Sequence, residues 1–264
     1  MVRPPTPSGA ATLVLLRDRP GGVETLLVQR HAGSKFAAGD HVFAGGKLEA
    51  DDMPSDVERF CLGLTAQEAA QRLGGRLAPR DAVAYWVGAV REAFEEVGML
   101  LAYTPDGEFV RFTRDNRDRY ASYRAACQAA NSAFFAMLRA EALTLATDRL
   151  VYFAHWITPE ESPIRFDTRF FAAVAPPGQE ATPDGREIVA LRWLRPAGAL
   201  EARGRKEISL RFPTVKNLEL LAGGSTAEAV LEDLRGSEVP TIRPRIVTVD
   251  GEPVAVLPGD PRWY

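Results

Sequence analysis

The chain has few of the residues that build disulfide-rich or zinc-binding scaffolds. Its 264 residues include only two cysteines, Cys61 and Cys127, and three histidines. Two cysteines cannot form a disulfide framework, so we expect two separate reduced thiols. No second histidine or cysteine stands at a zinc-ligand spacing from His41 or His155, and we expect both to be strand residues. Small disulfide-rich domains and zinc fingers are therefore excluded.

Long apolar runs and a large excess of one charge are missing as well. No stretch approaches the roughly 18 apolar residues needed to cross a bilayer, and residues 1–7 lack the apolar segment of a secretory signal. The chain has 32 basic and 35 acidic residues, so its formal net charge of -3 creates no field for long nucleic acid. We expect no membrane partner, no nucleic-acid partner and a cytoplasmic location.

The most informative motif that is present covers residues 91–98 and reads Arg-Glu-Ala-Phe-Glu-Glu-Val-Gly. On a helix, residues three and four apart share a face, so Glu92, Glu95 and Glu96 converge. Clustered like charges repel, and a hard divalent cation such as Mg2+ would neutralise them. The alternative is a solvated acidic face with Arg91 as its counter-ion.

A second motif lies upstream, where residues 43–52 read Phe-Ala-Gly-Gly-Lys-Leu-Glu-Ala-Asp-Asp. Its double glycine lets the backbone turn sharply and approach a ligand closely. Together the two motifs resemble the signature of the Nudix hydrolase superfamily: Gly, five residues, Glu, seven residues, Arg-Glu, an apolar residue, any residue, Glu-Glu, any residue, Gly and an apolar residue. Gly46 fits the first position, and residues 91–99 fit the last section, with Ala93 in the apolar slot.

The match departs from the signature in two places. Asp52 stands where the signature has Glu, and residues 53–90 replace the seven residues before Arg91. One branch of the superfamily, typified by the coenzyme A diphosphatase of animal peroxisomes and its bacterial relatives, carries an insertion at this place. Further segments resemble that branch, namely 39–43, 156–159, 165–171 and 257–260. Residues 261–264 differ from the Ser-Lys-Leu peroxisomal address, which favours a cytoplasmic enzyme.

The resemblance implies an α/β fold, the Nudix α/β/α sandwich with a mixed sheet and added helices. We expect one domain over residues 1–264, with an insertion at about 53–80 and a helical insertion at about 115–145. The implied activity is metal-dependent hydrolysis, with Mg2+ or Mn2+, of the diphosphate bond in a nucleoside diphosphate linked to another moiety. Coenzyme A or acyl-CoA is the preferred small-molecule substrate, giving adenosine 3',5'-bisphosphate and 4'-phosphopantetheine. NADH, ADP-ribose or another nucleotide, and a non-catalytic nucleotide-sensing module, are the alternatives; a homodimer is left open.

The resemblance also implies roles for individual residues. The candidate metal ligands are Glu92, Glu95, Glu96, a backbone carbonyl of Gly45 or Gly46, and Asp52, with which Asp51 competes. The candidate catalytic residues are Glu92, Glu95 and Arg91. Arg91 is expected to brace the acidic side chains by charge-assisted hydrogen bonds. Glu187, in a later loop, is a second candidate for the catalytic base.

The candidate substrate-binding residues are basic, namely Arg30, Lys47, Arg165 and Arg169. Arginine can hold a phosphate through two parallel hydrogen bonds. Arg165 and Arg169 share one strand face with Asp167 through period-two alternation, so the alternative is that Asp167 pairs with them structurally. Lys47 next to the glycines could contact a phosphate or be solvated.

Apolar periodicity and turn residues predict the elements around these motifs. A hairpin is expected over 9–17 and 24–30, and further strands over 150–157, 168–174 and 187–194. Helices are expected within 117–142 and over 196–200, 213–221 and 225–234, and a terminal hairpin over 246–249 and 254–257. Thr65 with Glu68, and Ser225 with Glu228, have capping-box spacing; Asp81 is expected to cap the acidic helix, and Gly98 to end it. The insertion is expected to form a lid or wall over the substrate.

Overall fold

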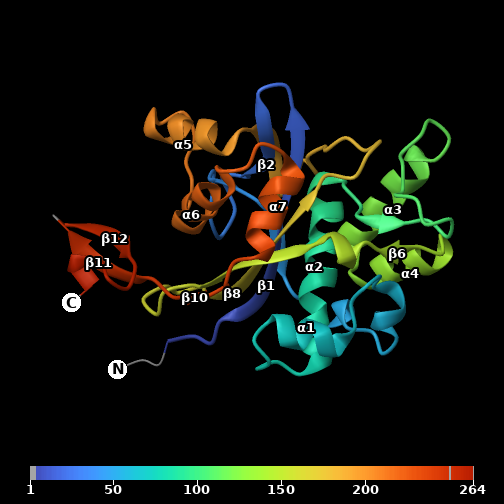
Figure 1. Cartoon of the computed structure of the whole chain (residues 1–264), viewed down its shortest axis with the longest axis horizontal. Coiled ribbons are helices and arrows are strands. Elements are labelled where there is room, and N and C mark those ends of the chain that lie inside the picture. The colour runs from blue at the N-terminus through green and yellow to red at the C-terminus, as the bar shows by residue number, and fades with distance from the viewer. Residues whose placement is uncertain (1–3, 250, 264) are drawn as a thin grey trace.

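A computed structural model describes residues 4–249 and 251–263 and has a mixed eight-stranded sheet at its centre (Figure 1). The strands of this sheet are β1 (Ser8–Arg19), β2 (Gly22–Arg30), β3 (His41–Val42), β4 (Ala44–Lys47), β7 (Val151–Ile157), β8 (Phe166–Val174), β9 (Ile188–Leu194) and β10 (Thr241–Ile242). Their order is β10-β7-β8-β1-β2-β3, with β4 also on β1 and β9 also on β2. The β1–β8 and β10–β7 pairs are parallel and the rest are antiparallel, as a mixed sheet requires.

Helices cover both faces of the sheet. They are α1 (Ala66–Arg72), α2 (Pro79–Val97), α3 (Arg117–Ala129), α4 (Ser132–Ala140), α5 (Pro196–Gly204), α6 (Phe212–Leu221) and α7 (Ala227–Arg235). Short 3-10 turns lie at η1 (Ala50–Asp52), η2 (Val57–Phe60), η3 (Thr147–Arg149) and η4 (Pro261–Trp263). Two small sheets pair β5 (Ala102–Tyr103) with β6 (Thr144–Leu145) and β11 (Arg245–Val249) with β12 (Glu252–Val256).

The layering follows from the alternation of side chains along β1. Leu13 and Leu15 point into a core shared with α1, α2, α3 and α4, whereas Val14 and Leu16 point into a core shared with α5, α6 and α7. Because successive strand residues face opposite sides, an unbroken apolar strand buries both faces. The predicted α/β/α sandwich is therefore confirmed.

Helix α2 is the element that carries the acidic motif. It runs from Pro79, with Ala78 as N-cap, and ends at Gly98, whose φ of 69° is left-handed. Proline suits the first helical position because its missing N–H would have no partner there, and glycine suits the left-handed end. The prediction of Gly98 as the terminator is confirmed; the prediction of Asp81 as the cap is wrong, because Asp81 lies inside the first turn.

The other predicted caps and hairpins have mixed outcomes. Thr65 and Glu68 form the expected capping box at α1. The Ser225 box is wrong, because the extended residue directly before α7 is Thr226, whose hydroxyl accepts from the Ala229 N–H. The first hairpin is confirmed as β1 and β2. The terminal hairpin is confirmed as β11 and β12, but its predicted turn residue Asp250 lies outside the described residues.

Part of the insertion is built into the helical layer that contains α2. Val57 and Phe60 of η2 and Leu73 beyond α1 belong to the same apolar core as Val83 and Trp86 of α2. These contacts place residues 57–73 beside the N-terminal half of α2. Within the described part of the chain, no helix has both the length and the apolarity to span a membrane.

Candidate metal and substrate site

The last two turns of α2 pack against the double glycine of β4, so the two halves of the motif meet. The Gly45 N–H donates to Glu96 Oε2 over 2.9 Å. A Cβ on Gly46 would lie 2.6 Å from Glu92 Oε1, and a Cβ on Gly45 would lie 2.5 Å from the Ala11 carbonyl oxygen. Both glycines are therefore needed for close approach, Gly46 to a carboxylate and Gly45 to the neighbouring strand.

Arg91 lies beneath the carboxylates and is almost fully buried. Its Nε donates to Asp52 Oδ1 over 2.6 Å, and its Nη2 donates to Asp52 Oδ2 over 3.0 Å. Its Nη1 lies 3.0 Å from Glu95 Oε2 and 2.9 Å from Glu92 Oε1. The Nη2 also donates to the Lys47 carbonyl. Arg91 thus ties the turn after β4 to the acidic face of α2, as charge-assisted pairs do.

Asp52 is fully buried, and both of its carboxylate oxygens are engaged. Besides Arg91, its Oδ2 accepts from the Glu49 N–H over 2.8 Å. These contacts hold Asp52 against Arg91 inside the protein, whereas Asp51 is exposed. The geometry gives Asp52 the task of fixing the guanidinium, a task the sequence reasoning did not assign to it.

Burial makes the ionised forms of the three glutamates unfavourable. Loss of solvent raises the pKa of Glu92 to about 7, although Arg91 opposes the shift. Burial likewise raises the pKa of Glu95, and it raises the pKa of Glu96 well above its usual range, with Glu92 adding repulsion. Three acids with disfavoured charges form a site in which a bound cation would be stabilising.

The donor set of this cluster matches a hard divalent cation. Glu95 Oε1 is buried without a hydrogen-bond partner, so one carboxylate oxygen has no use within the described structure. Carboxylate and carbonyl oxygens are the ligands that Mg2+ and Mn2+ prefer. Among the residues described, however, no three His, Cys, Asp or Glu side chains converge as a closed metal site. Glu92 and Glu95 instead turn toward Arg91.

Arg30 connects the acidic cluster to the loop before β9. Its Nη1 lies 3.6 Å from Glu96 Oε1, and its Nη2 donates to Glu187 Oε2 over 3.1 Å. The Glu187 side chain is 65% exposed, so it faces solvent at the edge of the cluster. The structure therefore brings Arg30 and Glu187 to the glutamates, although they are far apart in sequence.

The remaining predicted substrate-binding residues have other surroundings. Arg165 is buried and donates to the carbonyls of Thr158 and Pro5. Arg169 donates to Asp167 Oδ1 over 2.7 Å, so Asp167 pairs structurally with Arg169 but not with Arg165. Lys47 is exposed, with its Nζ 5.9 Å from the Phe166 ring centroid.

Sequence reasoning missed two residues of α3 that hold the end of α2. Arg124 donates to the carbonyls of Glu95 and Glu96 over 3.0 and 2.8 Å, and Gln128 donates to the Glu95 carbonyl over 2.7 Å. These carbonyls belong to the last turn of a helix, where backbone acceptors lack internal partners. Because α3 lies far along the chain, no local spacing could have revealed these contacts.

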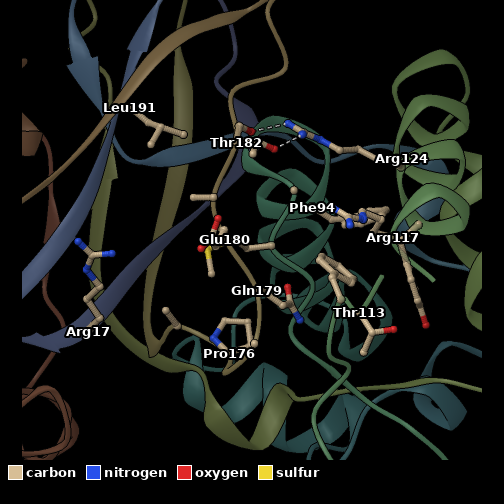
Figure 2. A pocket seen from close by; sticks show the side chains of 18 of the residues that line it. Arg17, Phe94, Thr113, Arg117, Arg124, Pro176, Gln179, Glu180, Thr182 and Leu191 are labelled. Carbon is tan, nitrogen blue, oxygen red and sulfur yellow. Dashed lines mark hydrogen bonds between the residues drawn. The ribbon is translucent and has the colours of Figure 1, made fainter. Parts of the chain in front are cut away.

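A cavity of about 1040 Å³ opens beside the last turn of α2 and was also missed. Figure 2 shows side chains from the sheet, such as Arg17 and Leu191, and from the helical layer, such as Phe94 and Arg117, around it. Arg124 reaches across to the hydroxyl and carbonyl oxygens of Thr182, which also lines the cavity. The cavity is formed by segments that only the fold brings together.

The hydrogen bonds and ion pairs of the insertion do not reach the glutamates in the part of the chain that the structure describes. Asp56 pairs with Arg139 of α4, and Arg80 donates to the Met53 carbonyl. In the described chain, no hydrogen bond or ion pair joins residues 53–80 to Glu92, Glu95 or Glu96. The lid is thus a prediction without a supporting contact.

Comparisons with known proteins show the family to which the chain belongs. The family model described as NUDT19 Nudix domain matches residues 64–221. The acyl-coenzyme A diphosphatase NUDT19 of Homo sapiens is 30% identical over 274 residues, covering 90% of this chain and 72% of the human protein. Its counterpart in Xenopus laevis is 29% identical over 206 residues, covering 67% of this chain and 54% of the frog protein. The chain thus spans about half the length of the frog relative.

A solved structure is similar over nearly its whole length. The Nudix hydrolase from Alicyclobacillus acidocaldarius has a TM-score of 0.70 and is 26% identical, with 88% of this chain and 99% of that chain covered. The residues that match the family model, 64–221, contain α2 with its acidic face. The chain belongs to the Nudix family, in the group described by the NUDT19 Nudix domain.

Proposed function

We propose that the protein is a metal-dependent diphosphatase that cleaves the diphosphate bond of a nucleoside diphosphate linked to another moiety. The observation that carries this proposal is the packing of three glutamates of α2, Glu96 buried and Glu92 and Glu95 partly buried, against the Gly45–Gly46 turn, beside an Arg91 that Asp52 holds in place. The names of the human and frog relatives support a diphosphatase. The same arrangement has no evident structural use, because it concentrates buried negative charge.

In this proposal Glu92, Glu95, Glu96 and the Gly45 carbonyl hold Mg2+ or Mn2+. Such an ion, when bound, shields phosphate oxygens and lowers the pKa of a coordinated water. The protein's own groups prepare the site: Arg91 orients Glu92 and Glu95, and the Gly45 N–H orients Glu96. Asp52 acts through Arg91, because both of its oxygens already accept hydrogen bonds from the protein.

Two groups remain candidates for the catalytic base. Glu92 lies within the cluster, where burial raises its pKa in the metal-free protein and a bound cation would lower it again. Glu187 is exposed at the edge of the cluster and is linked to Glu96 through Arg30. The dependence of turnover on pH in the Glu187→Gln variant separates them. If Glu187 is the base, the variant should lose the acidic limb of the pH–rate profile; if Glu92 is the base, that limb should remain.

For the substrate we propose coenzyme A or acyl-CoA, cleaved to adenosine 3',5'-bisphosphate and a 4'-phosphopantetheine. The support is the similarity to relatives that are named acyl-coenzyme A diphosphatases. Arg30 and exposed Lys47 are the proposed phosphate contacts, because they flank the cluster. For Arg165 and Arg169 the structural alternative accounts for their contacts.

The test is a panel of coenzyme A, acyl-CoA, NADH and ADP-ribose with Mg2+ or Mn2+, with products identified by mass. Cleavage of coenzyme A to the two named products supports the proposal, and preference for NADH or ADP-ribose would replace its substrate. Tight nucleotide binding without turnover of any compound would favour the non-catalytic sensing module. One domain over residues 1–264, a homodimer and a cytoplasmic location stay predictions, and light scattering after size exclusion checks the dimer.

A further inference from the structure

The cavity beside the last turn of α2 has the size of a small-molecule site. Its volume of about 1040 Å³ is slightly above the range of roughly 300–1,000 Å³ found for ligand pockets. It lies between the sheet and the helical layer, with Arg17 and Leu191 on the sheet side and Phe94 and Arg117 on the helical side (Figure 2). None of the proposed metal ligands lines it, so it can hold only a part of the substrate remote from the scissile bond.

The charged groups of the cavity favour an anion. Five arginines line it, against three acids, Asp18, Asp118 and Glu180. Arg17 is paired with Glu24, and Arg124 is bound to carbonyls of α2. The other three are Arg19, Arg114 and Arg117, and their guanidinium groups make no hydrogen bond or ion pair with any residue the structure describes. Unpaired guanidinium groups around a concave surface are suited to phosphate.

The apolar groups of the cavity suit a base. Phe94 and Met99 are buried beneath it, and Phe112 and Trp193 are partly exposed at it. The Arg17 guanidinium lies over the Trp193 ring, 4.1 Å from its centroid. Aromatic and guanidinium planes are surfaces on which nucleobases stack. A neutral pantetheine chain would use the apolar groups but leave the free arginines without partners.

Arg124 and the loop after β8 link the lining of the cavity to the acidic cluster. Arg124 lines the cavity and donates to the carbonyls of Glu95 and Glu96, the residues whose side chains belong to the cluster. The loop after β8 contributes Thr182 to the cavity and then reaches Glu187, which is bound to Arg30. A ligand in the cavity therefore lies against the same turn of α2 that holds the glutamates.

We propose that this cavity binds the nucleotide end of the substrate, an adenosine that carries a phosphate separate from the scissile diphosphate. Arg114 and Arg117 hold that separate phosphate, and the aromatic groups contact the base. This inference rests on the proposed function for the position of the scissile bond. It adds a specificity site that discriminates coenzyme A from its 3'-dephospho form.

The kinetic test uses the double variant Arg114→Gln/Arg117→Gln with coenzyme A and 3'-dephospho-CoA. Removing two charge-assisted contacts is expected to raise KM for coenzyme A about tenfold or more, with kcat and the KM for 3'-dephospho-CoA unchanged. Arg72→Gln is the matched control, since Arg72 is an exposed arginine on α1, outside the cavity. The proposal would be overturned if the double variant changed KM equally for both substrates, or changed KM for neither.

Equilibrium binding separates this inference from the proposed function. Calorimetry without added metal measures adenosine 3',5'-bisphosphate and 5'-AMP on the wild-type protein and the double variant. We expect the wild-type protein to prefer the bisphosphate and the variant to lose that preference. If the wild-type protein cleaves no compound, but prefers the bisphosphate and the variant loses that preference, the nucleotide site in the cavity is supported and the proposed function fails. If coenzyme A is cleaved but the variant binds the bisphosphate as the wild type does, the cavity proposal fails.

Discussion

Two buried arginines, Arg91 of α2 and Arg169 of β8, form the same kind of pair in different surroundings. Their exposed fractions are 2% and 5%, and each binds an aspartate, Asp52 or Asp167. At Arg169 the pair is closed, because His155 Nε2 also lies 2.7 Å from Asp167 and the guanidinium stacks over a tyrosine ring. At Arg91 the pair is open on one side, where Nη1 reaches two glutamates.

The difference shows what separates a structural ion pair from a positioning one. A buried pair contributes little net stability when each charge has been removed from water, so its presence alone does not identify a function. Around Arg169 the Asp167 carboxylate is shared by a guanidinium and an imidazole, and among the residues described no second acid pairs with either cation, although the Arg169 Nε is buried without a hydrogen-bond partner. Around Arg91 three acids gather at one guanidinium and Arg30, burial raises their pKa values, and Glu95 Oε1 is buried without a partner, so a further cation would compensate their charge.

The largest effect is expected from neutralising the acids that distinguish the Arg91 region. Glu95→Gln or Glu96→Gln should lower kcat about a thousandfold, because a metal ligand supports several kcal/mol of charge stabilisation and about 1.4 kcal/mol is tenfold. Steady-state hydrolysis assays measure kcat for both variants. The melting temperature of Glu96→Gln should not fall, because a carboxyl with a raised pKa destabilises the folded state once ionised.

Glu219→Gln is the matched control for these glutamates. Glu219 lies on α6, on the other face of the sheet, and pairs with Lys216 at the surface. Its replacement should leave both activity and melting temperature unchanged. Retention of activity in Glu95→Gln and Glu96→Gln would mean that the acidic face is a solvated surface.

The next largest effect is expected when the stability and activity of Asp52→Asn are compared with those of Asp167→Asn. Each change leaves a buried arginine with less compensation, so each should destabilise the fold by about 3 kcal/mol. Only Asp52→Asn should also lower kcat/KM, by about 10–100-fold, because groups that orient metal ligands have effects of that size. Urea unfolding and steady-state kinetics measure the two quantities. An equal activity loss in Asp167→Asn would place Arg169 in the site as well.

The roles of these aspartates could not be read from the sequence. Spacing placed Asp52 where the signature has a metal-site glutamate, but spacing does not say whether a carboxylate faces a cation or an arginine. In the fold Arg91, which is 39 residues further along the chain, reaches both Asp52 carboxylate oxygens. The pairing of Asp167 with Arg169 was foreseeable as an alternative, since two residues apart on a strand share a face.

The fold was more predictable than the site. The first strand, expected over 9–17, and the terminator Gly98 follow from local rules, and both were predicted from the sequence. The caps at Ala78 and Thr226 were missed by one to three residues, because several polar residues compete near a helix start. The cavity was missed entirely, because Arg17 and Arg117 meet only through the packing of the helical layer on the sheet.

A smaller effect separates the two glycines of β4. In Gly46→Ala the new Cβ would lie 2.6 Å from Glu92 Oε1, a flexible side-chain end, so Glu92 should move and kcat should fall about tenfold while stability holds. In Gly45→Ala the Cβ would meet the Ala11 backbone oxygen, which cannot move easily, so stability should fall by about 1–3 kcal/mol. Gly204→Ala, with open space around it, is the control. Equal stability losses in the two β4 variants would contradict this division.

The smallest effect uses the cysteines as reporters on the Arg91 region. Burial, with a further contribution from Glu95, raises the pKa of Cys127 to about 12, and burial raises the pKa of Cys61 to about 12. Alkylation needs the thiolate, so both thiols should react slowly at pH 8 and faster as the pH rises toward 12 or as the protein unfolds.

Asp52→Asn should accelerate alkylation of Cys127 about tenfold at pH 8, because loosening Arg91 opens the packing between α2 and α3 to solvent and lowers the thiol pKa by about one unit. Cys127 lies on α3, whereas Asp167 pairs with His155 and Arg169 on the sheet, so Asp167→Asn should leave the Cys127 rate unchanged. Mass spectrometry of iodoacetamide-treated protein measures both rates. Equal acceleration in the two variants would mean that Cys127 reports global unfolding, and urea midpoints for the same samples distinguish the two cases.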